Sequence, residues 1–363
     1  MSDQIVIIGA GVMGCASAVR LRQAGFEVLL LERALPGAES SAAAAGILGA
    51  QSEVSQAGAF LELCLASRAR FRDLCQELTE ITDIDIGYEE SGVLEVALDP
   101  AEGRLAAGRA EWMLDRGLNV ELLDREDARK LEPALTEQMI GANYYPDDHQ
   151  VDSVLLGKAL AAAAQRLGAR FESGRTVLGI ESHQGRVTGV ETAEGLIPAG
   201  RVVVAGGAWS SRLHGLPPLR TKVKPMAGQI AQLDTRPPLF RHVAYGFSGY
   251  VVPRADGRVL LGSTLEDRGF DKAVTAGGLH RILGMGITMI PGLAEARIDQ
   301  TWSGLRPATE DGSPILGRGS LEGLFYATGH YRNGILLTAI TADLIRDLLL
   351  EQEPELNISE FAP

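Results

Sequence analysis

The stretch IVIIGAGVMG, residues 5–14, joins an apolar run to glycines at positions 9, 11 and 14. The apolar run predicts a buried strand, and the glycine pattern predicts a tight turn into a helix. Gly9 permits the turn, Gly11 lets backbone N–H groups approach a pyrophosphate at the helix N-terminus, and Gly14 lets the helix pack closely on the strand. The stretch predicts a cradle for a dinucleotide, although the glycine pattern alone also occurs in turns that hold no ligand.

The residues after this cradle complete the same unit. A second apolar run, VLLL at 28–31, ends at Glu32, about 20 residues after the glycines, where a carboxylate can accept hydrogen bonds from a ribose diol. Gly25 lies where a glycine commonly ends a helix. The order of strand, glycine turn, helix, strand and acid strengthens the prediction of dinucleotide binding.

Small residues dominate the segment SSAAAAGILGAQ at 40–51. Small side chains let a backbone lie flat against a broad planar ligand, and the hydroxyls of Ser40 and Ser41 can reach phosphate oxygens. An alanine-rich helix that packs tightly is the alternative interpretation.

Length and charge restrict the class of protein. A chain of 363 residues with 45% hydrophobic side chains predicts two domains with a sizeable core. The formal net charge of −13 argues against a nucleic-acid or anionic membrane partner, and the local cluster Arg220, Lys222 and Lys224 is interpreted as a solvated strand face. No uncharged apolar run reaches about 18 residues, so no transmembrane span is predicted.

Cysteine and histidine usage gives two further expectations. The three cysteines, Cys15, Cys64 and Cys75, are odd in number and lie in helix-like segments, which favours reduced thiols and a cytoplasmic location. The six histidines lack the spacing with acids or cysteines that is typical of a metal site, so no metal is predicted.

Alternating strands and helices at both ends of the chain flank a strand-rich middle. This order predicts an α/β protein in which a Rossmann-like nucleotide-binding domain, at 1–81, 150–216 and 305–363, is interrupted by a strand-rich α+β substrate domain at 82–149 and 217–304. The expected helices are 53–80, 101–117, 125–131 and 153–167, the last capped by Asp152. Short strands are expected within 84–98 around Gly87 and Gly92, and strands are expected to dominate 223–264. The individual expected strands are 170–171, 176–181, 186–192, 201–205, 250–254, 259–263 and 324–328.

Two motifs near the C-terminus carry candidate chemistry. GLRP at 304–307 is followed by DGSP at 311–314, and GHYRNGI at 329–335 follows an expected strand. We expect the block at 329–335 to open a helix, whose N-terminus would stabilise negative charge on an electron-rich ring. Gly206 begins a similar turn, GGAWS, which favours a close ligand.

With these motifs at closely similar separations, nearly the whole chain resembles the glycine oxidases of the thiamine pathway, within the FAD-dependent D-amino acid oxidase superfamily. The resemblance implies FAD as the cofactor. The residues predicted to hold it are Gly9, Gly11, Val12, Met13, Gly14, Glu32, Arg33, Ser40, Ser41, Ala45, Gly46, Ile47, Val177, Gly206, His330, Tyr331, Arg332, Asn333, Gly334, Ile335 and Leu336. Monomeric sarcosine oxidases attach flavin through a cysteine in their C-terminal half, where this chain has none, so noncovalent FAD is expected.

The resemblance also assigns residues to the substrate. Arg306 matches the carboxylate-binding arginine, Tyr250 matches the tyrosine that donates to the same carboxylate, and Arg332 matches a second arginine near the substrate. The implied reaction is oxidative deamination of glycine by dioxygen to glyoxylate, ammonia and hydrogen peroxide, in a homo-oligomer for which a tetramer is expected. Each residue has a structural alternative, since an arginine can fix a loop and a tyrosine can be half-buried in a strand.

Three positions depart from this pattern. Ser248 and Leu265 stand where Bacillus-type members have histidine and methionine, and Ile47 also replaces a methionine. Because these positions are expected to shape the substrate pocket, sarcosine, another N-substituted glycine or a small D-amino acid are alternative substrates.

Three other function classes remain open from the sequence. A D-amino acid dehydrogenase of the same fold would pass electrons to a quinone at a membrane, and would form no hydrogen peroxide. A non-catalytic FAD-binding protein would keep the cradle, but the presence of Arg306 and Tyr250 argues against it. An NAD-dependent dehydrogenase would leave the block at 329–335 without an evident role.

Overall fold

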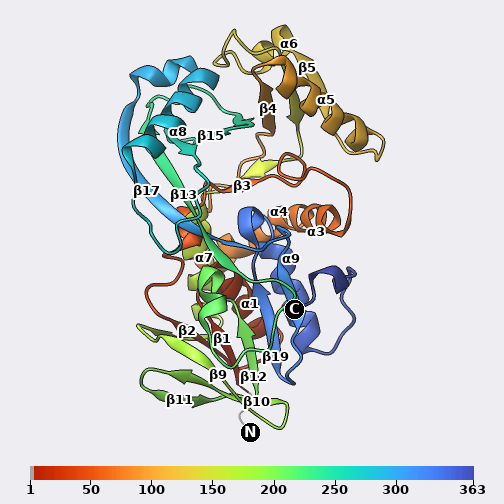
Figure 1. Ribbon diagram of the computed structural model, residues 1–363, viewed down its shortest axis with the longest axis vertical. Coiled ribbons are helices and arrows are strands. Elements are labelled where there is room, and N and C mark those ends of the chain that lie inside the picture. Colours follow the sequence, from red (N-terminus) through yellow and green to blue (C-terminus); the bar gives the residue numbers. More distant parts are fainter. Residues whose placement is uncertain (1–3) are drawn as a thin grey trace.

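The computed structural model describes residues 4–363 and contains two main β-sheets. The sheets occupy opposite ends of the molecule, and the long strands β13 (Lys224–Asp234) and β17 (Arg297–Ala308) run from the upper end toward the middle (Figure 1). One sheet is largely parallel and the other largely antiparallel, which confirms the predicted α/β class with a strand-rich second region.

The first region has three layers built around a six-stranded sheet. The strand order is β18-β19-β12-β1-β2-β8, and only the edge strand β18 runs antiparallel to its neighbour. A three-stranded antiparallel sheet covers one face and helices cover the other. The elements are β1 (Ile5–Ile8), α1 (Val12–Gln23), β2 (Val28–Glu32), α7 (Ser153–Arg166), β8 (Arg170–Ser173), β9 (Val177–His183), β10 (Arg186–Thr192), β11 (Gly195–Pro198), β12 (Arg201–Val204), β18 (Ile315–Arg318), β19 (Leu324–Thr328) and α9 (Thr338–Leu349).

The alternation of side chains along β1 explains this layering. Ile5 and Ile7 point into the core shared with α1, α7 and α9, whereas Val6 and Ile8 point into the core under the three-stranded sheet. Because successive side chains of a strand face opposite sides, an unbroken apolar run fits a central strand covered on both faces.

The second region is an eight-stranded sheet with helices around it. Its strand order is β17-β13-β16-β15-β14-β4-β6-β5. Besides β13 and β17, its elements are β4 (Val93–Ala97), α5 (Pro100–Leu114), β5 (Glu121–Asp124), α6 (Arg125–Leu131), β6 (Gly141–Tyr145), β14 (Val243–Gly246), β15 (Gly249–Pro253), β16 (Arg258–Gly262), α8 (Ala276–Met289) and the 3₁₀ turn Pro291–Glu295.

The helices α3 (Ala59–Ala69) and α4 (Phe71–Thr82) pack into the core of the first region, against α9 and α7. The remaining elements are α2 (Ser40–Ala43), the two-stranded pair β3 (Ile47–Leu48) and β7 (His149–Gln150), and the 3₁₀ turns Gly207–Arg212, Tyr331–Asn333 and Ser359–Phe361. The two sheets draw their strands from separate stretches of chain. The exact domain boundaries stay a prediction, and the first three residues of the predicted range 1–81 lie outside the described residues.

Several expected elements are confirmed. The helices at 125–131 and 153–167 and the strand at 324–328 are present, and the Asp152 side chain accepts hydrogen bonds from the N–H groups of Val154 and Leu155. Gly25, with φ of 88°, ends α1 as expected.

Other expected elements are wrong, and glycines explain most of the differences. Gly58, with φ of 146°, delays the helix expected from 53, which then divides at Arg70 into α3 and α4. Of the short strands expected around Gly87 and Gly92, which both have positive φ, only β4 forms within 84–98. The blocks after β12 and β19 form 3₁₀ turns, and α9 begins at Thr338 rather than within 329–335. The expected set also lacks α8 and the strands β5, β6, β11, β17 and β18.

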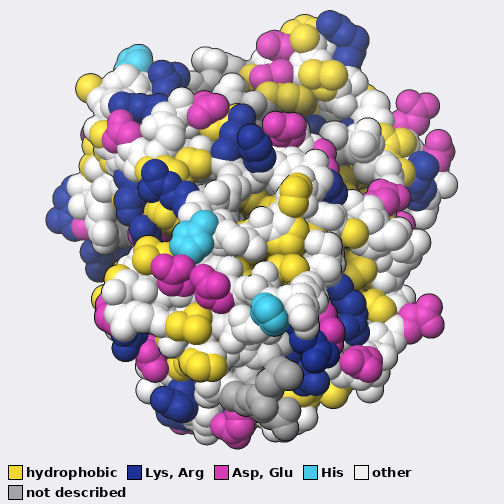
Figure 2. All heavy atoms as spheres, turned by 60° about the horizontal axis from the view of Figure 1, so that its bottom comes forward, with side chains coloured by type: hydrophobic (Ala, Val, Ile, Leu, Met, Phe, Trp, Pro, Cys, Tyr) yellow, Lys and Arg dark blue, Asp and Glu magenta, His cyan; other side chains and the backbone are white. Residues whose placement is uncertain are grey.

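Basic and acidic side chains lie interspersed over the face at the lower end of the molecule (Figure 2). None of the helices within residues 4–363 is long and apolar enough to cross a membrane.

Gly14 provides a test of the close packing between α1 and the turn after β1. A Cβ atom at Gly14 would lie 2.0 Å from the carbonyl oxygen of Gly9, so backbone must move. We expect Gly14→Ala to lower the free energy of unfolding of the apoprotein by about 1–3 kcal/mol, measured by urea denaturation. The matched control is Gly108→Ala in α5, where a Cβ meets no atom within 4 Å and helix propensity favours alanine. A Gly14→Ala protein as stable as Gly108→Ala would contradict this packing argument.

Candidate active site

A cavity of about 630 Å³ lies where the two regions meet. This volume is in the usual range for a small-molecule or cofactor site. The first region contributes the carboxyl ends of β1, β2, β12 and β19 and the start of α1, and the second contributes residues of β13, β15 and β17. The carboxyl ends of parallel strands are where ligands bind in open α/β sheets.

Most of the residues predicted from the sequence line this one cavity. They are Gly9, Gly11, Val12, Met13, Glu32, Arg33, Ser40, Ser41, Ala45, Gly46, Ile47, Val177, Gly206, Tyr250, Arg306, His330, Tyr331, Arg332, Gly334 and Ile335. Gly14, Asn333 and Leu336 are not in the lining: Gly14 packs α1 against Gly9, and the side chains of Asn333 and Leu336 are buried in the core.

Two of the three positions that depart from the family pattern lie outside the cavity. Ser248 is exposed at the turn between β14 and β15, and Leu265 is exposed after β16. Only Ile47 is part of the lining. The hairpin turn and the loop after β16 direct Ser248 and Leu265 to solvent, so the expectation that these two positions shape the pocket stays a prediction.

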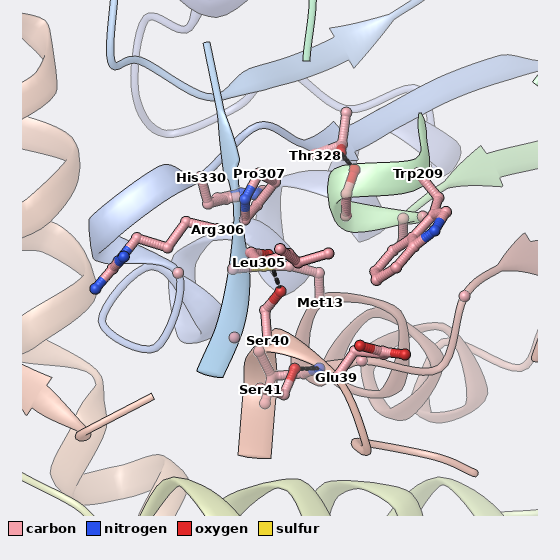
Figure 3. Close-up of a pocket in the computed structure, with 18 of the residues that line it drawn as sticks. Met13, Glu39, Ser40, Ser41, Trp209, Leu305, Arg306, Pro307, Thr328 and His330 are labelled. Carbon is pink, nitrogen blue, oxygen red and sulfur yellow. Dashed lines mark hydrogen bonds between the residues drawn. The ribbon is translucent and has the colours of Figure 1, made fainter. Parts of the chain in front are cut away.

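The glycine turn after β1 leaves its backbone open to a ligand. Gly9 has φ of 98°, and a Cβ there would lie 2.6 Å from the carbonyl oxygen of Ala205. Ser41 lies against the start of α1, where its Oγ accepts a hydrogen bond from the Val12 N–H at 3.1 Å, and Ser40 donates to the carbonyl of Leu305 (Figure 3). This end of the cavity is a helix N-terminus with small neighbours, which suits a pyrophosphate.

Glu32 occupies the end of β2 as predicted. Its carboxylate accepts hydrogen bonds from the N–H groups of Ala10 and Ala34, both at 2.9 Å. Each carboxylate oxygen has capacity for a further donor, so Glu32 can also accept hydrogen bonds from a ribose diol. The two backbone donors hold it in place for that role.

Trp209 is a cavity residue to which sequence reasoning assigned no role. The guanidinium of Arg33 lies 3.7 Å from the centre of the Trp209 ring, and Trp209 contacts Phe270 with ring centroids 5.3 Å apart. Arg33 also forms an ion pair with Glu39. Trp209 and Arg306 point to opposite sides of the pocket (Figure 3), so the cavity has a nucleotide end and a second, arginine end.

Arg306 projects from β17 at this second end. Its guanidinium donates to the hydroxyl of Ser263 and to the carbonyl of Thr264, and it lies over Gly228 of the neighbouring strand β13. A Cβ at Gly228 would lie 2.0 Å from Nη1 of Arg306. Within residues 4–363, Arg306 forms no ion pair with a carboxylate, so its charge is available to a ligand.

Tyr250 and Tyr245 flank this end. Their rings lie roughly parallel with centroids 6.5 Å apart, and Gly262 makes room for the Tyr250 ring, since a Cβ there would approach it to 2.7 Å. The hydroxyl of Tyr245 accepts a hydrogen bond from Nη2 of Arg332 at 2.5 Å.

Glu53 is the second cavity residue that the sequence did not single out. Its carboxylate is 7% exposed and lies 3.5 Å from Nη2 of Arg332, whose side chain is 41% exposed. Burial raises the pKa of Glu53, and the charges of Arg332 and Arg306 oppose that rise. The pKa of Arg332 is in turn raised chiefly by the charge of Glu53. No local motif marks Glu53, because its partner is distant in the sequence.

His330 is a buried member of the lining. Its Nε2 lies 3.0 Å from the hydroxyl of Thr341, and burial lowers its pKa to about 3. The imidazole is therefore neutral near pH 7 and packs as part of the wall. No group of three or more His, Cys, Asp or Glu side chains suited to a metal ion occurs in the part of the chain that the structure describes.

The low pKa of His330 makes a prediction about stability. Since the unfolded chain takes up a proton near pH 6.5 and the folded chain does so only near pH 3, stability is lost as pH falls through this window. We expect His330→Asn to remove this contribution, which amounts to at most about 1.4 kcal/mol per pH unit. Urea denaturation of the apoprotein between pH 7 and 4 measures it, with the exposed His183→Asn as control. If the free energy of unfolding of His330→Asn depends on pH as steeply as that of the wild type, the prediction is refuted.

Comparison with known proteins agrees with this geometry. The family described as FAD dependent oxidoreductase matches residues 4–348. The bifunctional protein ThiO/ThiG of Synechocystis sp. is 38% identical over the whole chain, which spans about half (54%) of that relative's length. The glycine oxidase of Geobacillus kaustophilus is 37% identical over 99% of this chain and 96% of its own.

Solved structures give the same result. The crystal structure of glycine oxidase from Geobacillus kaustophilus has a TM-score of 0.95, with 36% identity over 99% of this chain and 98% of that one. The iminodiacetate oxidase of Chelativorans sp. BNC1 has a TM-score of 0.90 and 28% identity, with 99% and 98% covered. The chain therefore belongs to the family of FAD dependent oxidoreductases.

Proposed function

We propose that this protein oxidises glycine and related small amines with dioxygen, giving glyoxylate or another 2-oxo acid, ammonia and hydrogen peroxide, and that it serves thiamine biosynthesis. The observation that carries the proposal is the unpaired Arg306, which shares one cavity with the dinucleotide cradle. A nucleotide site next to a free cation suits a cofactor enzyme whose substrate is a small carboxylate.

The charges at the arginine end decide where a substrate carboxylate binds. Arg332 is already engaged by Glu53 and Tyr245, whereas Arg306 contacts only neutral oxygens. A planar guanidinium can bind a carboxylate through two parallel hydrogen bonds. Arg306 therefore binds the substrate carboxylate, and the hydroxyl of Tyr250 donates to the same group.

The cavity residues position the amine rather than exchange protons with it. FAD, when bound, supplies the hydride acceptor and passes the electrons to dioxygen. Val12, Ser41 and Glu32 would hold its ADP half, and Ala45 to Ile47 would line its ring. Arg306 fixes the α-carbon in orientation, and burial of Tyr250 and Ile47 excludes water. Neutral His330 is not a general base in this scheme.

Noncovalent binding of FAD is part of the proposal, and the positions of the cysteines support it. Cys15 and Cys64 are buried in α1 and α3, and Cys75 is half-buried in α4. None of the three is in the cavity lining. A homotetramer and a cytoplasmic location stay predictions.

An N-substituted glycine is a second candidate substrate. Arg332 lines the cavity and its side chain is 41% exposed, so a second acidic group on the amine could reach its guanidinium and share it with Glu53. The similarity to an iminodiacetate oxidase supports the same alternative. Sarcosine and iminodiacetate are therefore the first amines to compare with glycine.

Arg306 is tested by comparing kinetic constants. We expect Arg306→Ala to lower kcat/KM for glycine roughly 30-fold to 1,000-fold, equivalent to about 2–4 kcal/mol, because Tyr250 alone remains to bind the carboxylate. The fall in kcat/KM should come mainly from a higher KM, and the flavin spectrum of the variant should match that of the wild type. Arg297→Ala, an exposed position on the same strand β17, is the control. Normal glycine turnover in Arg306→Ala would overturn the assignment.

The reaction is tested with purified protein and no variant. We expect a flavin spectrum, release of FAD on acid denaturation, bleaching by glycine without oxygen, and recovery in air with one hydrogen peroxide per flavin. Bleaching without peroxide on admission of air would favour a dehydrogenase. A flavin that sarcosine or iminodiacetate bleaches and glycine does not would move the proposal to N-substituted glycines.

A further inference from the structure

A buried arginine lies behind the cavity segment Ala45–Ile47. Arg254 follows β15 in the second region and is only 6% exposed. Its Nη1 donates to Oε1 of Gln150 at 2.7 Å and its Nη2 donates to the carbonyl of Ala45 at 2.6 Å. Arg254 does not line the cavity, but Ala45 does.

No carboxylate within residues 4–363 forms an ion pair with Arg254. Asp152 is close enough to act on its charge, but Asp152 is itself bound by Arg258 at 3.0 Å and caps α7. Burial lowers the pKa of Arg254, although arginine keeps its proton at any ordinary pH. A buried cation held only by neutral oxygens is costly, so its retention calls for a negative partner or a positional role.

The contacts of the neighbouring peptides supply the positional role. The carbonyls of Ala43, Ala44 and Gly46 are bound by Trp302, Ser153 and the N–H of Val151, and Arg254 binds the remaining carbonyl, that of Ala45. In a planar trans peptide the N–H of Gly46 points away from the Ala45 carbonyl, and hence away from Arg254. Among the described residues, that N–H donates no hydrogen bond.

We propose that Arg254 is a positioning residue that raises the reduction potential of the bound flavin. It holds the Ala45 peptide so that the Gly46 N–H faces the cavity, and its buried charge favours the negative charge that the flavin ring gains on reduction. The inference rests on FAD being held in this cavity, as in the proposed function, and is independent of which amine is oxidised.

The test measures the two-electron reduction potential of the holoenzyme with a reference dye, and its Kd for sulfite from the flavin absorbance. We expect Arg254→Gln to lower the equilibrium constant for reduction about tenfold, which is about 30 mV for a two-electron couple, and to weaken sulfite binding by a similar factor. Arg254→Lys keeps the charge and should stay within threefold of the wild type.

Arg125→Gln is the matched control, because Arg125 also donates to a backbone carbonyl, that of Met139, at 2.7 Å, but lies in α6 away from the cavity. An unchanged potential in folded, FAD-containing Arg254→Gln would overturn the proposal. A potential in Arg254→Lys as low as in Arg254→Gln would overturn the part that rests on charge.

If Arg254→Gln gives no folded holoenzyme, a second variant tests whether the charge of Arg254 acts on the flavin. Asp152→Asn removes the carboxylate that offsets the charge of Arg254 and that pairs with Arg258, and asparagine caps a helix as well as aspartate does. We expect it to strengthen sulfite binding and raise the potential. No change, or weaker binding, contradicts the proposal. A protein that shows these shifts but does not oxidise glycine would refute the proposed substrate alone.

Discussion

The pairing of β13 with β17 is the constraint on which the site depends. In this antiparallel register Met226 is opposite Arg306 and Gly228 is opposite Gly304, so the guanidinium of Arg306 lies over a strand position without a side chain. Gly304 in turn accepts the close approach of α2, since a Cβ there would lie 2.5 Å from the Cβ of Ala43. A slip of one residue would turn Arg306 to the other face of the sheet and separate it from the dinucleotide cradle.

The arginines at the site differ in whether they have an acidic partner, and this difference indicates what each one does. Arg33 and Arg332 have acidic partners, Glu39 and Glu53, and are held as parts of the wall. Arg306 and Arg254 contact only neutral oxygens, which is costly in a partly or fully buried place unless an anion arrives. One of them faces the cavity and the other lies behind its lining. A substrate carboxylate and a reduced ring are the two negative charges that such an arrangement accommodates.

The sequence predicted the parts of the site that depend on residues close together in the chain, and it missed those that depend on distant residues. The cradle was predictable because Gly9, Gly11 and Glu32 belong to one local unit of strand, turn, helix and strand. Glu53 and Trp209 were missed because their partners, Arg332 and Arg33, come from distant elements and leave no periodic signal. The helix expected to begin within 329–335 fails for a local reason that the sequence hides: Gly329 and Tyr331 both adopt positive φ, which turns the chain before α9 can start.

Long-range polar contacts also explain why the missed carboxylate is so well fixed. The fully buried Asp148 accepts hydrogen bonds from the N–H groups of Gln51 and Ser52 and from Arg68, and so holds the two residues that precede Glu53. Such a buried pair contributes little net stability, because desolvation offsets most of its attraction. Its effect is geometric: it prevents the loop from relaxing away, so that Glu53 stays within reach of Arg332. Because Arg332 is neutralised in this way, a small carboxylate entering the cavity meets a single uncommitted guanidinium, that of Arg306.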